Sequence, residues 1–314
     1  MPRQMERSDR FGIPAALAIL GSTAMLGGAA QPATAQVPEE AGVRTEFLAF
    51  HNVTGAWELS KGAGARVAVV DWLFDMSPGA SGKYVDAVSL VPGQGIGDME
   101  PWHGEWMAET IHRIAPEAKI IPIRARPDND PETDRENGEN PYETYLIQAI
   151  RYAADHGAIA VTNSMGPVRQ STELDQAVRY AESKGTVFID VHPEYLTHSD
   201  GSFEFCENGG CNDRILHVGI VSVPDHPVRP DPERDLYTWP YEIDPVFRDG
   251  WGFSNGPPIA AGVIALMKGA NPRLTGPDLK RVLIETSTMR DGFGVIDAEA
   301  AVRTAQRLAT GRDR

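Results

Sequence analysis

Hydrophobic and polar positions follow two different periods along most of this chain. Short runs rich in apolar and β-branched residues predict buried strands at 65–70, 118–123, 158–162, 186–191 and 215–223. Apolar positions three and four residues apart predict helices at 105–115, 145–154, 172–183, 259–267, 277–286 and 298–308. Strand and helix therefore alternate, and this order predicts an α/β fold with a mostly parallel central sheet and helices on both faces.

Residues 1–35 have the pattern of a secretory signal peptide. Three arginines precede an apolar stretch over 11–30, and Ala33-Thr34-Ala35 matches a cleavage site. A retained membrane anchor is the competing interpretation, but Gly, Ser, Thr and Pro interrupt the apolar stretch and favour cleavage. We therefore expect a secreted or periplasmic protein that does not contact the membrane after cleavage.

The rest of the chain divides into an extension, one domain and a tail. A modest helical pattern at 47–59 lies within an N-terminal extension, residues 36–60. The alternating strands and helices occupy residues 61–308 without an internal repeat, and residues 309–314 form a C-terminal tail. Residues 224–250 are rich in Pro, Asp, Glu and Arg, which predicts a long surface connection inside the domain.

The net charge limits the classes of partner, and the two cysteines indicate a disulfide. The chain has 314 residues and a formal net charge of −15 at pH 7, which argues against nucleic acid or an anionic membrane as a partner. Its two cysteines, Cys206 and Cys211, predict a disulfide across a short loop in an exported protein, with two unpaired thiols as the alternative. The composition does not indicate an oligomeric state.

No residue pattern indicates a metal site or a required cofactor. The acidic stretch at 128–139 comes nearest to a calcium loop, but it lacks the glycine and the distal glutamate of an EF-hand. Two cysteine sulfurs are too few for a structural zinc site. Structural calcium therefore stays an alternative without a clear site in the sequence, and the acidic stretch favours a solvated surface loop.

Three polar residues stand where α/β proteins place catalytic groups. Asp71 ends the strand at 65–70, at the sheet edge where such folds hold their sites. His103 lies at or just before the start of the helix at 105–115, outside its apolar stripe. Ser254 precedes two prolines and an apolar helix, as a nucleophile presented at a helix start does. Taken singly, Asp71 has a plainer explanation as a turn cap and Ser254 as a helix N-cap.

Taken together, these residues resemble the triad of the subtilisin-like serine peptidases, the subtilases. The order Asp, His, Ser is the subtilisin order. The run from Val67 to Asp71 resembles the strand that carries the subtilase aspartate, and the run from His103 to Ile111 resembles His-Gly-Thr-His-Val-Ala-Gly-Thr-Ile. The run from Gly252 to Gly262 is similar to Gly-Thr-Ser-Met-Ala-Ala-Pro-His-Val-Ala-Gly. The resemblance extends over roughly residues 45–305.

This resemblance implies a three-layer subtilisin-like fold, a catalytic domain at 61–308 and serine endopeptidase activity. Ser254 would attack the scissile carbonyl, His103 would accept and return the proton, and Asp71 would orient the imidazole. Ser164-Met165-Gly166 matches the Ser-Leu-Gly strand with which the family binds an extended polypeptide substrate by strand addition.

The chain departs from the family pattern close to these residues. Trp72-Leu73 stands where the family has Thr-Gly or Ser-Gly, and Phe253 stands where it has threonine. An alignment of residues 185–189 with the strand before the family's Gly-Asn puts Glu194 at the oxyanion asparagine, unless Asn208 or Asn212 folds back to that place. Loss of one such donor typically lowers turnover by about 100- to 1,000-fold.

Two functions therefore compete. The first is a secreted serine endopeptidase with an atypical oxyanion hole, and the alternative is a catalytically impaired subtilase-like protein that binds or regulates. An unrelated α/β hydrolase is disfavoured, because that class needs the order Ser, Asp, His, and no histidine follows Ser254 in this chain.

Overall fold

A central sheet organises the part of the chain that the structure describes. The computed structural model describes residues 45–100, 103–128, 141–165, 171–191, 212–224, 227–228, 230, 235–241, 243 and 252–310. All of them belong to one compact unit, Glu40–Arg314. Within these ranges the sheet has nine strands in the order β2-β3-β1-β4-β5-β6-β7-β9-β8. The strands are β1 (Arg66–Asp71), β2 (Val88–Ser89), β3 (Lys119–Arg124), β4 (Ala160–Asn163), β5 (Val187–Val191), β6 (Leu216–Ile220), β7 (Leu236–Thr238), β8 (Thr288–Arg290) and β9 (Phe293–Val295).

The sheet is parallel except at one edge, where β8 pairs with β9 in the antiparallel direction. β1 lies between β3 and β4, with Asp71 opposite Arg124 and Val70 opposite Asn163. Since parallel strands end at the same edge of a sheet, the polar residues at the ends of β1, β3 and β4 meet there.

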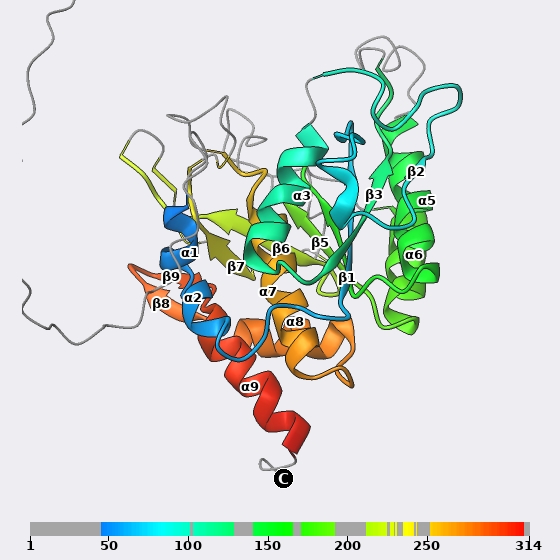
Figure 1. Cartoon of the computed structure of the whole chain (residues 1–314). Helices are drawn as coiled ribbons and strands as arrows, with labels where there is room; N and C mark the ends of the chain where they lie inside the picture. The colour runs from blue at the N-terminus through cyan, green and yellow to red at the C-terminus, as the bar shows by residue number, and fades with distance from the viewer. Residues whose placement is uncertain are drawn as a thin grey trace, which may run out of the picture. The chain divides into compact units, whose positions relative to one another are not determined.

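Helices cover both faces, as the alternating pattern predicted. The helices are α1 (Glu46–Phe50), α2 (Val53–Ala56), α3 (His103–Ile114), α5 (Pro141–Asp155), α6 (Thr172–Ser183), α7 (Gly256–Ala270), α8 (Gly276–Glu285) and α9 (Ala298–Thr310). One hydrophobic core joins the sheet to α3, α7, α8 and α9, and a second core joins its other face to α5 and α6. Figure 1 shows α5 and α6 side by side in green, apart from α3 and α7. The structure is thus the three-layer, mostly parallel α/β fold that the sequence predicted.

The N-terminal extension docks through a buried histidine instead of forming the single helix that its pattern at 47–59 indicates. It contains two short helices, because Asn52 takes a left-handed conformation (φ 54°) between them. His51 is fully buried. Its Nδ1 lies 2.9 Å from the carbonyl oxygen of Ile296, and the backbone N–H of Trp239 donates to its Nε2 at 3.1 Å. The neutral imidazole thus links the extension to two later segments of the chain.

A second expectation from the sequence is wrong in the part of the segment that the structure describes. Residues 224–250 were expected to form a surface connection, but Leu236–Thr238 is a buried strand, β7, between β6 and β9. A strand of three residues is too short to show the alternation of a half-buried strand, and the surrounding prolines and acidic residues indicate a loop. The sheet therefore extends further than the periodic pattern predicts.

Candidate active site

Asp71 projects toward the α3 and α7 layer because side chains alternate along a strand. Val67 and Val69 belong to the core under α3 and α7, whereas Ala68 and Val70 pack against α5 and α6. Asp71 continues the first series. Its side chain is fully buried, so its carboxylate requires hydrogen-bonding partners in that layer.

α3 begins at His103, and Gly104 allows the start of this helix to approach the turn after β1. A Cβ atom on Gly104 would lie 2.7 Å from Cζ of Phe74 and 2.8 Å from the carbonyl oxygen of Leu73. Even the smallest side chain would force the two segments apart. Glycine therefore sets the distance between His103 and the end of β1.

His103 and Asp71 form a hydrogen-bonded pair. Nδ1 of His103 lies 2.9 Å from Oδ1 and 3.0 Å from Oδ2 of Asp71, and the backbone N–H of Trp72 donates to Oδ1 at 2.7 Å. An ionised carboxylate can only accept, so this contact assigns the proton of the neutral imidazole to Nδ1 and leaves Nε2 as the basic nitrogen. The side chain of His103 is 25% exposed and that of Asp71 is 0% exposed, so the pair connects the protein interior to the surface.

Ser254 lies just before α7 and contacts the segment that follows β4. Oγ of Ser164 donates to the carbonyl oxygen of Ser254 at 2.8 Å, and Oγ of Ser254 donates to the carbonyl oxygen of Ser164 at 3.4 Å. Because Val70 of β1 pairs with Asn163 of β4, Ser164 follows its strand at the level of Asp71. Neighbouring strands lie about 4.8 Å apart, so Ser254 reaches the sheet edge that holds Asp71.

The bulky residues that distinguish this chain from the family pattern are largely buried. Phe253 is 8% exposed and belongs to an apolar cluster with Val191 and Ile220, at the ends of β5 and β6. Leu73 is fully buried, whereas Trp72 is half-buried. The large side chains at 73 and 253 therefore extend the core.

A buried amide organises the end of β4, where Ser164 and Met165 lie. Oδ1 of Asn163 accepts from the hydroxyl of Tyr142 and, at 3.1 Å, from the backbone N–H of Met165. Its Nδ2 donates to Oδ1 of Asp190 on β5 at 2.8 Å. Asn163 thus ties the turn after β4 to α5 and to the neighbouring strand, while Met165 remains partly exposed beside it.

Several residues singled out from the sequence lie outside the described residues. These are Gly166, Glu194, Cys206 and Cys211, together with most of the acidic stretch at 128–139. Within the described ranges, no group of three or more His, Cys, Asp or Glu side chains is arranged to hold a metal ion. The assignments to Glu194 and to a Cys206–Cys211 disulfide therefore stay predictions.

The sequence did not single out a second polar cluster beside Asp71. Arg124 ends β3 opposite Asp71 and is fully buried. It pairs with Asp128, whose Oδ1 also accepts from the indole Nε1 of Trp72 at 3.0 Å. An arginine at the end of a buried strand was the available signal, since a buried guanidinium requires partners for its donors.

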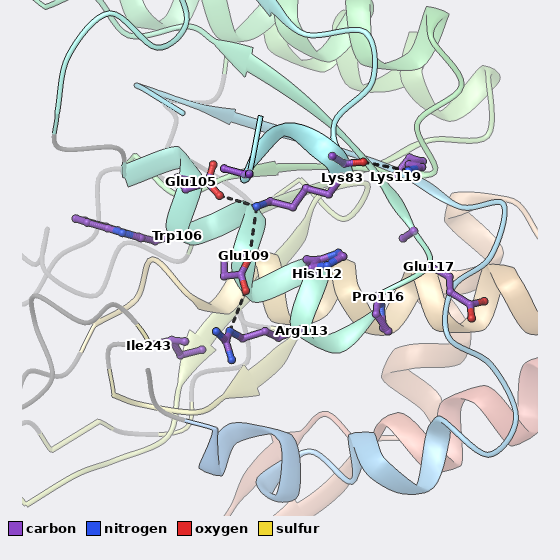
Figure 2. A pocket seen from close by; sticks show the side chains of 14 residues that line it. Lys83, Glu105, Trp106, Glu109, His112, Arg113, Pro116, Glu117, Lys119 and Ile243 are labelled. Carbon is purple, nitrogen blue, oxygen red and sulfur yellow. Dashed lines mark hydrogen bonds and ion pairs between the residues drawn. The ribbon is translucent and has the colours of Figure 1, made fainter. Parts of the chain in front are cut away.

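A cavity of about 700 Å³ lies along the outer side of α3. Figure 2 shows Lys83 between Glu105 and Glu109, with Arg113 next to Glu109. These opposite charges offset one another. Asp71, His103 and Ser254 do not line the cavity, although its residue Trp106 has its ring centroid 6.4 Å from that of His103.

Fold and site together define an α/β protein with the architecture of the subtilisin-like peptidases. Of solved structures, the MycP3 protease from the type VII (ESX-3) secretion system is similar with a TM-score of 0.64 and 22% identity, over 85% of this chain and 90% of that one. Fervidolysin from Fervidobacterium pennivorans, described as a keratinolytic enzyme related to subtilisin, gives a TM-score of 0.60 and 20% identity, over 79% of this chain and 44% of that one.

Sequence comparison leads to the same class. Thermitase of Thermoactinomyces vulgaris is 28% identical over 145 residues, which cover 43% of this chain and 49% of thermitase. A thermophilic serine proteinase of Bacillus sp. (strain AK1) is 33% identical over 150 residues, or 43% of this chain and 34% of the relative. The chain thus spans half or less of the curated relatives it matches, and no family model matches it. In sequence and in fold it is similar to the subtilisin-like serine peptidases, which confirms the resemblance that its three motifs indicated.

Proposed function

We propose that this protein is a serine endopeptidase of the subtilisin type, with Asp71, His103 and Ser254 as its catalytic triad. The observation that carries the proposal is the contact of His103 Nδ1 with both carboxylate oxygens of a fully buried Asp71, at 2.9 and 3.0 Å. A pair of this kind fixes the tautomer and the orientation of the imidazole. Ser254 lies at the same sheet edge, directly before the N-terminus of α7.

In the proposed reaction, Nε2 of His103 takes the proton of the Ser254 hydroxyl as Oγ attacks the scissile carbonyl. His103 then gives that proton to the leaving amine, and a water molecule hydrolyses the acyl-enzyme by the same route. In the structure Oγ of Ser254 instead donates to the carbonyl of Ser164 at 3.4 Å, which is long for a hydroxyl hydrogen bond. A contact this weak costs little to break.

The negative charge of the tetrahedral intermediate needs donors. Only Asn255 separates Ser254 from α7, and the dipole of this helix gives its N-terminus a partial positive charge. Its first residues supply no free amide, because the N–H of Gly256 donates to the carbonyl oxygen of Phe253 at 2.9 Å and Pro257 and Pro258 have none. We propose Glu194 at the place of the family's asparagine. A protonated Glu194 can donate to the oxyanion, whereas an ionised one repels it. Activity is then expected to rise below neutral pH until His103 becomes protonated, so a kcat/KM profile with its maximum at alkaline pH argues against this role.

The proposed substrate is a polypeptide in extended conformation. Ser164, Met165 and Gly166 would pair with its backbone as an added strand. The hydrogen bonds of Asn163 support this role, because they hold the segment after β4 in place before a substrate arrives. We expect no cofactor to be required for the reaction.

Reaction with a serine-directed fluorophosphonate tests the proposal, because only an activated hydroxyl is labelled quickly. The wild-type protein is expected to be labelled, and Ser254→Ala and His103→Ala are expected to lose labelling. Equal labelling of all three proteins contradicts the peptidase proposal. If the wild-type protein is folded but unlabelled, the alternative function holds, and the protein is a subtilase-like binding or regulatory protein.

We also propose that the protein is exported after cleavage of residues 1–35. The signal-like pattern of that segment supports this proposal. In the described part of the chain, no helix has the length and apolar character needed to span a membrane. N-terminal sequencing of the exported protein is expected to begin at Gln36, and alkylation before and after reduction is expected to show Cys206 and Cys211 as a disulfide. A mature chain that still begins before residue 36 contradicts the export proposal.

A further inference from the structure

A buried arginine lies beside the proposed triad and takes no part in its chemistry. Arg124 ends β3 in register with Asp71 of β1. It is fully buried, and Nε donates to the carbonyl oxygen of Arg126 at 3.2 Å. Its terminal nitrogens donate to the carbonyl oxygen of Gly95, to Oε1 of Gln94 at 2.7 Å and to the carboxylate of Asp128. These partners hold the guanidinium in one position.

Asp128 is held by this arginine and by the same loop. Its backbone N–H donates to Oε1 of Gln94 at 2.9 Å, so Gln94 bridges Arg124 and Asp128. An ion pair between a fully buried arginine and a partly buried aspartate adds little net stability, because desolvation of the charges offsets their attraction. What such a pair provides here is a carboxylate in a defined place, next to the segment that follows β1.

Trp72 connects this carboxylate to the triad. Its indole Nε1 donates to Oδ1 of Asp128 at 3.0 Å, and its backbone N–H donates to Oδ1 of Asp71 at 2.7 Å. Asp71 in turn contacts Nδ1 of His103. The side chain and the backbone of one residue therefore link the Arg124–Asp128 pair to the Asp71 carboxylate.

We propose that Trp72 is a positioning residue, which Asp128 and Arg124 hold through the indole so that its backbone N–H orients the Asp71 carboxylate and, through it, His103. The residue that follows the aspartate is small in the subtilase pattern, so this tether is a property of the present chain. The catalytic meaning of the inference rests on the proposed function, but the orientation of His103 is measurable without turnover.

Trp72→Phe is the variant that tests the tether. It removes the indole N–H but keeps an aromatic ring and the backbone donor to Asp71. The matched control is Trp57→Phe, since Nε1 of Trp57 donates to the carbonyl oxygen of Ile114 at 2.7 Å, at the opposite end of α3 from His103. Each variant loses one indole hydrogen bond of a partly buried tryptophan.

Two measurements report on the orientation of His103. The first is the downfield proton resonance of its Nδ1–H, assigned by its loss in His103→Ala, and the second is the pH dependence of fluorophosphonate labelling. Trp72→Phe is expected to shift the resonance, to move the pH profile and to slow labelling roughly tenfold, less than the about 100-fold of a 1 Å misplacement. Trp57→Phe is expected to keep the wild-type resonance and profile.

The inference is overturned if Trp72→Phe keeps the resonance and the pH profile of the wild-type protein, or if Trp57→Phe changes them equally. Asp128→Ala removes the carboxylate that accepts from the Trp72 indole. This variant must move the resonance in the same direction as Trp72→Phe. A wild-type protein that is not labelled, but whose resonance responds to Trp72→Phe and not to Trp57→Phe, refutes the peptidase proposal while the positioning role stands.

Discussion

The two helix layers of this protein differ in how tightly they are built onto the sheet. α7 is buried at every position from Gly256 to Met267, whereas α6 is buried at Leu174, Ala177, Val178 and Ala181. α7 runs through the protein interior, whereas α6 is an amphipathic surface helix. The candidate active site lies on the layer that contains the buried helix.

Close packing in that layer fixes the relative position of the two helices that lead to the site. A Cβ atom on Gly262 of α7 would lie 2.8 Å from Cβ of Ile114 on α3, so the helices cross where one of them has no side chain. His103 begins α3, and Ser254 lies just before α7. A small displacement of either helix therefore changes the geometry of the site, whereas α6 contributes no residue to it and α5 reaches it through the hydrogen bond of Tyr142 with Asn163.

The largest effects are expected from cavities on the two sides of the sheet. Ile111 on α3 and Leu146 on α5 are both fully buried, and truncation of either to alanine is expected to lower the free energy of unfolding by about 2–5 kcal/mol. Only Ile111→Ala should also slow fluorophosphonate labelling, because α3 carries His103. Chemical denaturation and labelling at a temperature where both variants are folded check this. Equal slowing of labelling in Leu146→Ala contradicts the comparison.

Acid is expected to weaken the attachment of the N-terminal extension. Burial lowers the pKa of His51 to about 4, although the hydrogen bond with the Ile296 carbonyl opposes the shift. The unfolded chain, with a histidine pKa near 6.5, binds a proton that the folded protein excludes between these values, so stability falls as the pH drops from about 6.5 to 4. The loss reaches about 3 kcal/mol at most.

A substitution of His51 separates this effect from general acid unfolding. Glutamine can donate to one partner and accept from the other but does not titrate over this range. His51→Gln should therefore make the free energy of unfolding less dependent on pH between 4 and 6.5, measured by denaturation at several pH values. The same pH slope in His51→Gln and the wild-type protein rules out His51 as the cause.

A smaller effect on stability, but a selective one on the site, is expected from Gly104→Ala. The new Cβ would meet Phe74 and the Leu73 carbonyl, which costs about 1–3 kcal/mol by overpacking. A displacement of His103 by 1 Å would slow labelling by about 100-fold. Ala181→Gly on α6 is the control, since it costs about 1 kcal/mol of helix stability and is expected to leave labelling unchanged. Similar labelling rates in the two variants would show that Gly104 does not set the position of His103.

The smallest effect tests whether the whole α7 layer is coupled to the site or only the helices next to it. Thr275 caps α8 in a capping box with Asp278, on the same side of the sheet as α7. Thr275→Ala is expected to cost about 1 kcal/mol of stability without a change in labelling. A clear loss of labelling would extend the coupling to α8.

The sequence predicted best the elements that are long enough for their apolar positions to repeat regularly. The predicted helix at 172–183 has the same bounds as α6, and the helix at 298–308 differs from α9 only at its end. Short elements were missed, because three residues of β7 or β8 cannot display a period. The single helix expected at 47–59 is interrupted at Asn52 by a left-handed backbone, which local apolar spacing does not reveal.

In the candidate site, too, the sequence predicted local features but not the contacts between distant segments. By itself the sequence determined which residues are candidates, because Asp71, His103 and Ser254 each stand in a motif of neighbouring residues. Only the tertiary structure decided that Nδ1 of His103 faces the Asp71 carboxylate, that Ser164 and Ser254 contact each other, and that Phe253 enters a buried cluster. It also decided the partners of Arg124, Asp128 and Trp72. The physical reason is that periodicity and motifs are local, whereas these contacts join segments up to 90 residues apart, and their geometry depends on how strands pair and helices cross.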